Sequence, residues 1–461
     1  MHDQSNESDA TIQIKRNRLS ASVTKLLLPS GLIDRLCEEV GHEYRERIYT
    51  PSIVVWMFIM QVLSKDHSCQ QVVARFNGWR IAQGLRRVSS DTTSYCKARI
   101  RLPEKLFERL LALTAARCEE AIDQALLFHG RQVIMVDGWT VTMADTSDNQ
   151  QAYPQLKSQK RGCGFPIARM VGLFSLATGA IERFAIAPYA GKQTGETSLL
   201  RLIWTRVLPG QIVLADRYYA TYWLLASSEK QGIDFVARVH HLRTVDFRRG
   251  MKLGRFDQLV VYQRPKQRPQ WMSTEEYATY PETILVRHLR YRHTQKGFRT
   301  HELTLATTLD RSKYSVEDLA ELYRRRWEVE LNIRSLKTQM QMEHLRCKRP
   351  SMVRKEIACH MIAYNLVRAT MVVSALTTGM PPHHISFTGT MQSLEEFATS
   401  LRYLKRDKQR RWQQLLQSIA EIQVGHRPGR VEPRELKRRP KPYKWMTTPR
   451  KSTRNPAATA A

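Results

Sequence analysis

Paired cysteines are missing from this sequence, and their absence excludes two classes of cross-linked domain. The chain has 461 residues and only seven cysteines, an odd number, and none of them stand in a Cys-x2-Cys spacing. A disulfide framework and a zinc ribbon both need paired or closely spaced cysteines. The seven are scattered singly: Cys37, Cys69, Cys96, Cys118, Cys163, Cys347 and Cys359. We therefore expect free thiols in a reducing compartment.

Long uninterrupted apolar runs are also missing. The run at 53–63 is about half as long as a bilayer crossing requires, and the run at 361–376 is interrupted by Asn365 and Arg368. The first ten residues are polar and acidic, unlike a secretory leader. The sequence therefore predicts no membrane span and no secretory signal, and we expect a cytoplasmic protein.

Acidic residues are scarce compared with basic ones. The sequence has 43 Asp and Glu against 73 Lys and Arg, a formal net charge of +30 and a pI near 10.1. Such a surface attracts phosphate backbones through counterion release. The basic residues also run the whole length of the chain, which is not typical of a single membrane-surface helix. The charge predicts a polyanionic partner; a generally basic protein with solvated Lys and Arg faces is the alternative.

The sequence does contain enough apolar material for several folded domains. Hydrophobic residues make up 42% and charged residues 25%, which argues against global disorder. A polar segment at 1–21 precedes residues 22–128, where helical spacing and N-cap residues predict an all-helical N-terminal domain. Within it, the Arg-rich stretch 68–102 is interpreted either as a helix-turn-helix or as an ordinary helical packing face.

Buried strands begin after residue 128. The apolar run 132–136 ends at Asp137, the run 212–215 ends at Asp216, and two strands between them join at a hairpin turn at Thr178-Gly179. Together with the helical stretches around them, these strands predict an α/β layer with helices on its faces. We assign this layer to residues 129–241 and 306–378.

Two further regions complete the predicted organisation. Residues 242–305 alternate like strands but are polar, which predicts a β-rich insertion. Residues 379–461 form a C-terminal region whose tail beyond Gly425 is dense in Lys and Arg. We expect this tail to be disordered until it meets DNA.

Two carboxylates stand at the ends of apolar strands. Asp137 follows VIMV and Asp216 follows IVLA, so each is expected at the rim of the sheet, where ligands of α/β sheets bind. An Asp at a strand end is also a common turn former or N-cap. Each of the two residues, taken alone, leaves both interpretations open.

A third acid lies in a helical segment between cations. The run from Tyr323 to Lys337 has the pattern Tyr-x2-Arg-x3-Glu-x6-Lys, with Arg326 and Glu330 inside it. At about 100° per residue, the four side chains fall within about 60° of one another on a regular helix. A carboxylate between two cations suits a site for metal and phosphate. A solvated stripe of ordinary ion pairs is the alternative.

These motifs together resemble the insertion-sequence-four family of DDE transposases, whose signature is this Tyr-Arg-Glu-Lys pattern on a helix. VDGWTVTMADT and LADRYYATYWLL are similar to the segments around the first and second catalytic Asp, and SSDTTSYCKARIRLP to the N-terminal region. The resemblance implies an RNase H-like catalytic core with a β-rich insertion between the second Asp and the Glu. Residues 242–305 fit that position.

The resemblance also implies site residues and partners. Asp137, Asp216 and Glu330 would hold Mg²⁺, with Mn²⁺ as a substitute, and catalyse strand cleavage and transfer. Contacts to DNA phosphates would come from Tyr323, Arg326, Lys337 and Arg217. The expected partners are double-stranded DNA, both transposon ends and target, and a second protomer in the DNA complex. The expected location is the cytoplasm of a bacterium, at the nucleoid, and residues 22–128 would bind the terminal inverted repeats.

Some roles stay open at this point. Related enzymes use a Trp of the insertion to stack a flipped base, whereas a Trp in such an insertion, like Trp271, is more often a core residue. A metal-dependent nuclease without a joining step, and a non-catalytic DNA-binding descendant, are the alternatives to a transposase. The intact acidic triad argues against the non-catalytic protein, because a pure DNA binder has no reason to keep carboxylates beside DNA.

Overall fold

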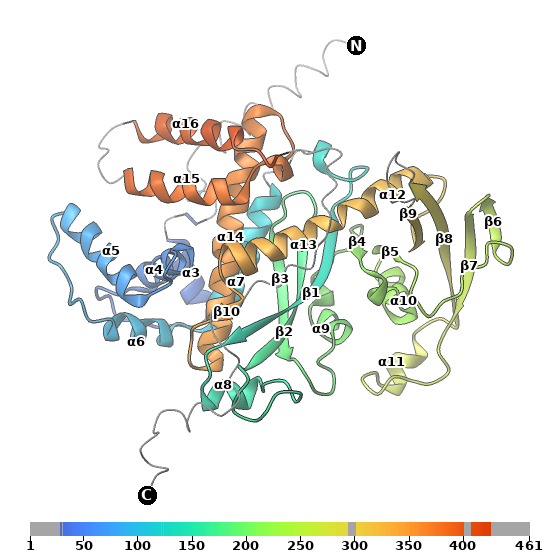
Figure 1. The fold of residues 1–461 in the computed structure, drawn as a ribbon, viewed down its shortest axis with the longest axis horizontal. Helices are drawn as coiled ribbons and strands as arrows, with labels where there is room; N and C mark the ends of the chain where they lie inside the picture. The colour runs from blue at the N-terminus through green and yellow to red at the C-terminus, as the bar shows by residue number, and fades with distance from the viewer. Residues whose placement is uncertain are drawn as a thin grey trace, which may run out of the picture.

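The computed structural model describes residues 28–29, 31–120, 122, 124–293, 301–400 and 407–425. The predictions for the polar segment 1–21 and for the basic tail beyond Gly425 concern residues outside these ranges. Figure 1 shows the N-terminal helices at one end of the molecule, strands β6–β9 at the other, and the rest of the sheet between them.

Residues 31–120 contain helices and no strand. The helices are α3 (Leu32–Glu39), α4 (Pro51–Leu63), α5 (Cys69–Ala82), α6 (Thr93–Arg101) and α7 (Glu104–Glu120). Thr50 and Ser68 cap α4 and α5 by accepting hydrogen bonds from backbone N–H groups of the first turn, the usual role of such residues. Residues 83–92 separate α5 from α6, a longer connection than the short turn of a helix-turn-helix.

The strands form one ten-stranded mixed sheet. Its order is β3-β2-β1-β4-β5-β9-β8-β7-β6, and β10 also pairs with β1. The strands are β1 (Val133–Met143), β2 (Ile167–Ser175), β3 (Ile181–Pro188), β4 (Ile212–Ala215), β5 (Asp234–Arg238), β6 (Met251–Gly254), β7 (Asp257–Gln263), β8 (Thr283–His293), β9 (His301–Thr307) and β10 (His344–Leu345). We expected strand β1 to end at Asp137. It instead continues to Met143, because β2 pairs with it along its length.

Helices cover both faces of the sheet. Alternate residues of β1 enter different cores, with Met135 on one side and Val136 on the other. Helices α7 and α14 (Pro350–Thr378) pack on the first side, and α9 (Glu196–Ile203) and α10 (Tyr222–Lys230) on the second. This two-sided burial explains why the central strands are continuously apolar. The remaining helices are α8 (Ser147–Ala152), α11 (Thr274–Ala278), α12 (Val316–Arg325), α13 (Trp327–Arg334), α15 (Phe387–Ser400) and α16 (Lys408–Glu421).

The strands of the expected insertion continue the central sheet. Strand β9 pairs antiparallel with β5, and β8, β7 and β6 follow outward. A buried ion pair joins β7 to β8: Arg287 Nε and Nη2 each donate to Asp257 at 2.8 Å. Arg287 Nη1 also donates to the carbonyl oxygen of Tyr314 at 2.8 Å. This arginine therefore ties the outer strands to the residue before Ser315, the N-cap of α12.

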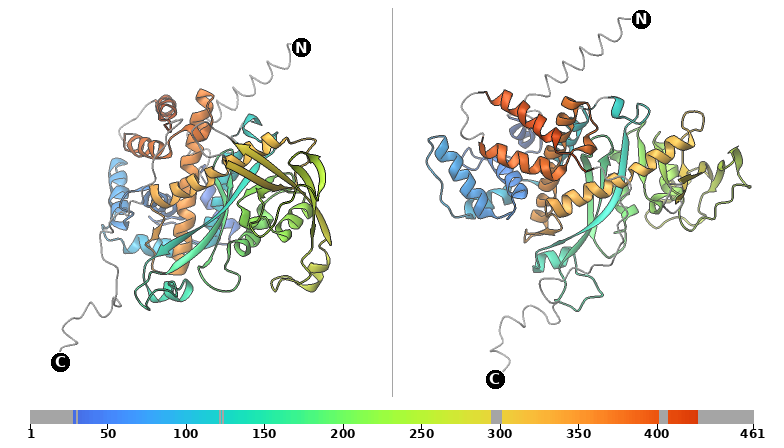
Figure 2. Two further views of the ribbon diagram at one scale, coloured as in Figure 1. Left: turned by 45° about the vertical axis from the view of Figure 1, so that its right-hand side comes forward. Right: turned by 45° about the horizontal axis from the view of Figure 1, so that its top comes forward.

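Helix α14 lies between the N-terminal helices and the sheet in all views (Figures 1 and 2). Among the described residues, it is the only helix long and apolar enough to cross a membrane, yet 94% of that stretch is buried inside the protein. Its polar interruptions have internal partners. Asn365 pairs with both backbone groups of Ile181, and Arg368 Nε donates to the carbonyl oxygen of Thr178. The helix is therefore a core element that grips the β2–β3 hairpin.

The hairpin turn was correctly expected at Thr178-Gly179. Gly179 has a φ of +71°, and a Cβ atom there would lie 2.1 Å from Arg368 Nη2. Only glycine meets both the left-handed backbone and the close approach of the guanidinium.

Candidate active site

Asp137 and Asp216 lie on neighbouring strands at the same end of the sheet. Strands β1 and β4 run parallel, and their last paired residues are Val136 and Ala215. Asp137 comes next on β1 and Asp216 directly follows the end of β4, so strands about 4.8 Å apart place the backbones of the two acids next to each other. Asp137 Oδ1 accepts a hydrogen bond from Gly138 N at 2.8 Å. The structure thus brings the first two predicted site residues together.

Glu330 is joined to Asp137 through the guanidinium of Arg326. Arg326 Nη2 lies 2.7 Å from Glu330 Oε1, and Arg326 Nη1 lies 3.9 Å from Asp137 Oδ2. A cation between two carboxylates offsets the repulsion between their charges. The third predicted acid and the predicted phosphate ligand Arg326 therefore both lie beside the first acid.

The helix that carries Glu330 is not the single regular helix expected from Ser315 towards His344. Helix α12 begins with the expected cap, where Ser315 and Asp318 form a capping box. Helix α13 follows after Arg326 and widens into a π turn over Ser335–Gln339. Because a π turn departs from α-helical spacing, the angle calculated for Lys337 does not describe its position.

Tyr323 lies close to the acids on the buried side. Its side chain is 7% exposed, and Arg326 Cζ lies 5.9 Å from its ring centroid. Burial raises the pKa of Tyr323 to about 12; the charge of Arg326 opposes this rise and that of Asp216 adds to it. Tyr323 is therefore protonated at neutral pH and available as a hydrogen-bond donor.

Lys337 and Arg217 are not drawn into the acidic group. Lys337 Nζ lies 3.8 Å from Glu343 Oε1, an exposed acid beyond the π turn. Arg217 follows Asp216 directly and is half-exposed. Within the described part of the chain it forms no ion pair, so its guanidinium is accessible beside the second acid.

Glu196 is a fourth acid at this edge that we did not predict from the sequence. A Cβ atom on Gly138 would lie 2.6 Å from Glu196 Cδ, so this carboxyl group packs directly over the residue after Asp137. Tyr219 donates a hydrogen bond to Glu196 Oε2 at 3.2 Å. The sequence alone gives little reason to assign Glu196 to the site. A Glu in the first turn of a helix is common because its negative charge is stabilised by the positive end of the helix dipole.

The electrostatics of Asp137 reflect this crowding. Burial raises its pKa to about 6. The hydrogen bond from Gly138 and the charge of Arg326 lower the pKa, whereas the charges of Glu196 and Glu330 raise it further. Two nearby carboxylates make the charged form of Asp137 unfavourable while no cation is bound. The same three charges together attract a cation.

The residues present fit a divalent metal by the chemistry of their donors. Asp137, Asp216, Glu330 and Glu196 belong to the same edge of the sheet, and hard cations prefer carboxylate oxygens. Across the described ranges, however, no three Asp, Glu, His or Cys side chains are close enough to form a ready-made metal site. The guanidinium of Arg326 occupies Oε1 of Glu330 at 2.7 Å.

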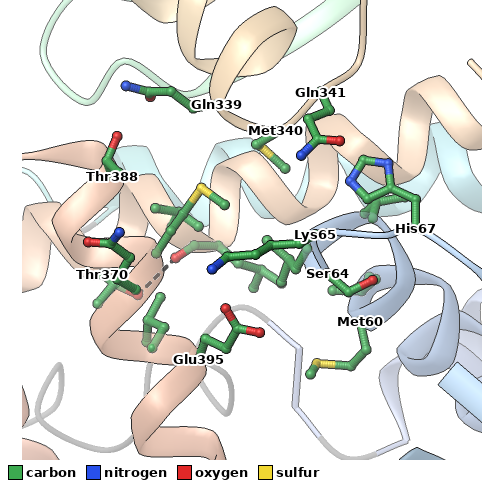
Figure 3. A pocket seen from close by; sticks show the side chains of 18 of the residues that line it. Met60, Ser64, Lys65, His67, Gln339, Met340, Gln341, Thr370, Thr388 and Glu395 are labelled. Atoms are coloured by element: carbon green, nitrogen blue, oxygen red, sulfur yellow. Dashed lines mark hydrogen bonds between the residues drawn. The ribbon is translucent and has the colours of Figure 1, made fainter. Parts of the chain in front are cut away.

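An apolar cavity of about 430 Å³ lies in another part of the protein (Figure 3). That cavity lies between α4, α14 and α15 and the end of the π turn, and none of the three predicted catalytic acids lines it. Lys65 and Glu395 are among its few charged lining residues.

Trp271 packs within an aromatic cluster. Arg201 Cζ lies 3.8 Å from its ring centroid, and Trp223 meets it edge to face at 6.3 Å. Arg201 belongs to α9, the helix that begins with Glu196, and Trp223 belongs to α10. These contacts give Trp271 a packing role between the outer strands and the helices on one face of the sheet.

Comparison with known proteins agrees with the geometry of this edge. Residues 128–366 match the family model described as the transposase DDE domain. The chain is also similar to the transposase InsG for insertion sequence element IS4 of Escherichia coli (strain K12), at 26% identity over 434 residues, which cover 92% of this chain and 93% of that protein. The match to the family model includes Asp137, Asp216 and Glu330 and spans more than half of the chain. The chain therefore belongs to the insertion-sequence-four family of DDE transposases, enzymes that cut and join DNA with the help of divalent metal ions.

Proposed function

We propose that this transposase binds the terminal inverted repeats of an insertion sequence, cleaves the DNA at its ends and joins those ends to target DNA. The observation that carries the proposal is the meeting of Asp137 and Asp216 on neighbouring parallel strands with Glu330 linked through Arg326. These acids are assigned as the catalytic triad and the metal ligands. An RNase H-like core is supported by the order β3-β2-β1-β4-β5, antiparallel on one side of β1 and parallel on the other.

Mg²⁺, or Mn²⁺ in its place, would be held by Asp137, Asp216 and Glu330. Bound there, divalent metal would activate the attacking water or 3′-hydroxyl and stabilise the leaving oxygen of the phosphodiester. The protein side chains align the DNA and neutralise its phosphates. This division of work suits phosphodiester transfer, in which charge builds on both entering and leaving oxygens.

Arg326 is assigned a dual role. In the structure its guanidinium neutralises Glu330 and Asp137. A planar guanidinium can also grip a phosphate through two parallel hydrogen bonds. We propose that Arg326 exchanges its carboxylate partners for a phosphate of the transposon end, with the Tyr323 hydroxyl donating beside it. Lys337 and Arg217 are assigned to backbone phosphates on either side.

The N-terminal helices supply a basic groove that supports their assignment to the terminal repeats. A groove of about 1050 Å³ runs between residues 42–49 and α6, and its lining includes Arg45, Arg47, Lys97 and Arg101 against the single acid Glu43. Such a groove neutralises phosphates without needing a specific base sequence. The basic residues beyond Gly425 would add to this affinity.

We expect two protomers in the DNA complex, because the element has two ends and each protomer carries one triad. We also expect the protein to act at the nucleoid in the bacterial cytoplasm.

The proposed reaction is tested with purified protein, Mg²⁺, a labelled duplex of one terminal repeat and a supercoiled target plasmid. Transfer of the labelled 3′ end into the plasmid supports the transposase. Cleavage without transfer would instead favour a nuclease, and binding without cleavage would favour a non-catalytic DNA-binding protein.

Arg326→Ala is expected to lower strand transfer by at least about tenfold, because it removes the cation that serves both the acids and the phosphate. Lys337→Ala should lower transfer by a similar factor through loss of a phosphate contact, and Tyr323→Phe should have a smaller effect. Transfer assays and gel shifts measure these changes, with thermal melting to verify folding.

Arg325→Ala is the matched control for these variants. Arg325 forms an ordinary i,i+3 ion pair with Glu328 at 2.9 Å on the same helical run, worth at most a few tenths of a kcal/mol. It should keep near wild-type transfer. Full activity in both Arg326→Ala and Lys337→Ala would show that these residues are ordinary surface partners.

Glu196→Gln is expected to weaken Mn²⁺ binding by about three- to tenfold. The amide keeps the size of the side chain and an acceptor for Tyr219, but it removes a negative charge beside Asp137. Isothermal titration with Mn²⁺ measures the affinity. Glu328→Gln serves as the control, since Glu328 pairs with Arg325 and not with the acidic edge. Unchanged Mn²⁺ affinity in Glu196→Gln would restrict Glu196 to a packing role.

A further inference from the structure

A buried arginine in the N-terminal helices lacks the partner that such a cation normally requires. Arg99 of α6 is 7% exposed. Removing a guanidinium from water is costly unless an anion compensates it. Within the described residues, no carboxylate forms an ion pair with Arg99. Its hydrogen-bond partners are instead Gln61 Oε1 at 3.0 Å and two cysteine sulfurs.

The two sulfurs belong to Cys69 and Cys96. Arg99 Nη2 lies 3.3 Å from Cys69 Sγ and 3.7 Å from Cys96 Sγ, and the two sulfurs lie 3.7 Å from each other. Cys69 opens α5, and Cys96 lies in the first turn of α6. Both thiols are half-buried and free. Two thiols within contact of one guanidinium, on two different helices, are arranged for reaction with each other.

The surroundings favour one thiolate in this pair. The hydrogen bond with Cys69, followed by the charge of Arg99, lowers the pKa of Cys96 to about 5 against the effect of burial. The same hydrogen bond, followed by burial, raises the pKa of Cys69. Four other titratable groups lie near Arg99. Burial raises the pKa of Tyr95, Cys347 and Cys359 and lowers the pKa of Lys355. A thiolate on Cys96 would supply Arg99 with the negative charge that none of the described carboxylates provides.

We propose that Cys69 and Cys96 form a peroxide-sensitive dithiol that closes to a disulfide between α5 and α6. The Cys96 thiolate attacks hydrogen peroxide, breaks its O–O bond and becomes a sulfenic acid, releasing hydroxide. Cys69 then attacks this sulfur, the S–S bond forms, and water leaves with the Cys69 proton. Each sulfur loses one electron, and the peroxide gains both. The site is independent of the catalytic edge and of the metal.

A disulfide between Cys69 and Cys96 would act on α6, a helix that also lines the basic groove. On α6, Lys97 and Arg101 line the basic groove described above, whereas Cys96 and Arg99 meet α5 and α4. A disulfide would fasten α6 to the start of α5 and leave Arg99 without a thiolate partner. Reduction by a dithiol would restore the original contacts.

The experiment uses the full chain, reduced and then treated with hydrogen peroxide, followed by alkylation and peptide mapping. A Cys69–Cys96 disulfide is expected as the first product. Cys69→Ser should leave a sulfenic acid on Cys96 that a dimedone probe captures, and Cys96→Ser should give neither product. Cys163→Ser, at a half-buried thiol elsewhere, is the matched control and should leave the disulfide yield unchanged. Scrambled disulfides, or no sulfenic acid on Cys96 in Cys69→Ser, would overturn the proposal.

A second measurement needs no variant and so does not depend on how the serine variants fold. In the wild-type protein at pH 6, Cys96 should react with an alkylating agent about five- to tenfold faster than a free cysteine peptide. Its larger thiolate fraction outweighs the lower nucleophilicity of a low-pKa thiolate. A rate equal to that of the peptide, or slower, would refute the assignment.

Discussion

Asp137→Asn, Asp216→Asn and Glu330→Gln are each expected to lower the rate of DNA strand cleavage by at least about a thousandfold, since losing metal stabilisation of the transition state costs about 4 kcal/mol or more. Each change removes one carboxylate charge and keeps the size of the side chain. DNA binding should stay within a few-fold of wild type, because no basic contact is lost. The measurement is single-turnover cleavage of a labelled terminal-repeat duplex, with gel shifts for affinity.

Asp148→Asn provides the comparison for this series. Asp148 is an exposed acid in the first turn of α8, a few residues beyond the end of β1, and its loss should leave cleavage unchanged. A variant of the triad that cleaves at a near wild-type rate would remove its residue from the assignment.

Arg287→Met is expected to lower the free energy of unfolding by about 3–5 kcal/mol, because it leaves the buried Asp257 carboxylate without its guanidinium. Arg287 is 1% exposed and holds Asp257 through two hydrogen bonds. The second cationic partner of Asp257, Arg311, lies 3.1 Å away but is 43% exposed and compensates less. Chemical denaturation followed by circular dichroism measures the change.

Arg292→Ala tests whether burial is the cause. Arg292 lies on the same strand and pairs with Glu302 at 3.0 Å, but both side chains are exposed. Its loss should cost no more than about 1 kcal/mol. A double change, Asp257→Leu with Arg287→Met, should recover part of the stability lost in Arg287→Met, because no charge then stays buried alone. If Arg287→Met and Arg292→Ala proved equally mild, the ion pair between β7 and β8 would not hold the outer strands.

The parts of the site that could be predicted from the sequence are those set by local pattern. Asp137 and Asp216 each follow an apolar run, and a parallel pairing of two such runs places the following residues together. The capping box at Ser315 and the turn at Gly179 are equally local, since each depends on a few adjacent residues. Glu330 was found because it repeats at helical spacing with Tyr323 and Arg326.

The parts that could not be predicted depend on contacts between distant segments. Glu196 reaches Asp137 only because α9 packs over Gly138, a contact that no spacing in the sequence encodes. The pairing of β9 with β5, which merges the outer strands with the central sheet, is likewise a long-range choice. The π turn after Arg334 invalidates an angle calculated for Lys337, because helical periodicity assumes that each turn is alike.

The three predicted catalytic acids lie far apart along the chain, so the ribosome synthesises them at different times. The residues of the N-terminal basic groove are synthesised first, followed by Asp137 and Asp216. Glu330 is synthesised only after strands β6–β9. On the proposed assignment, the residues that hold DNA are synthesised before the last of the residues that cut it. On the same assignment, cleavage requires α13 to pack against β1, because this packing brings Arg326 and Glu330 beside Asp137.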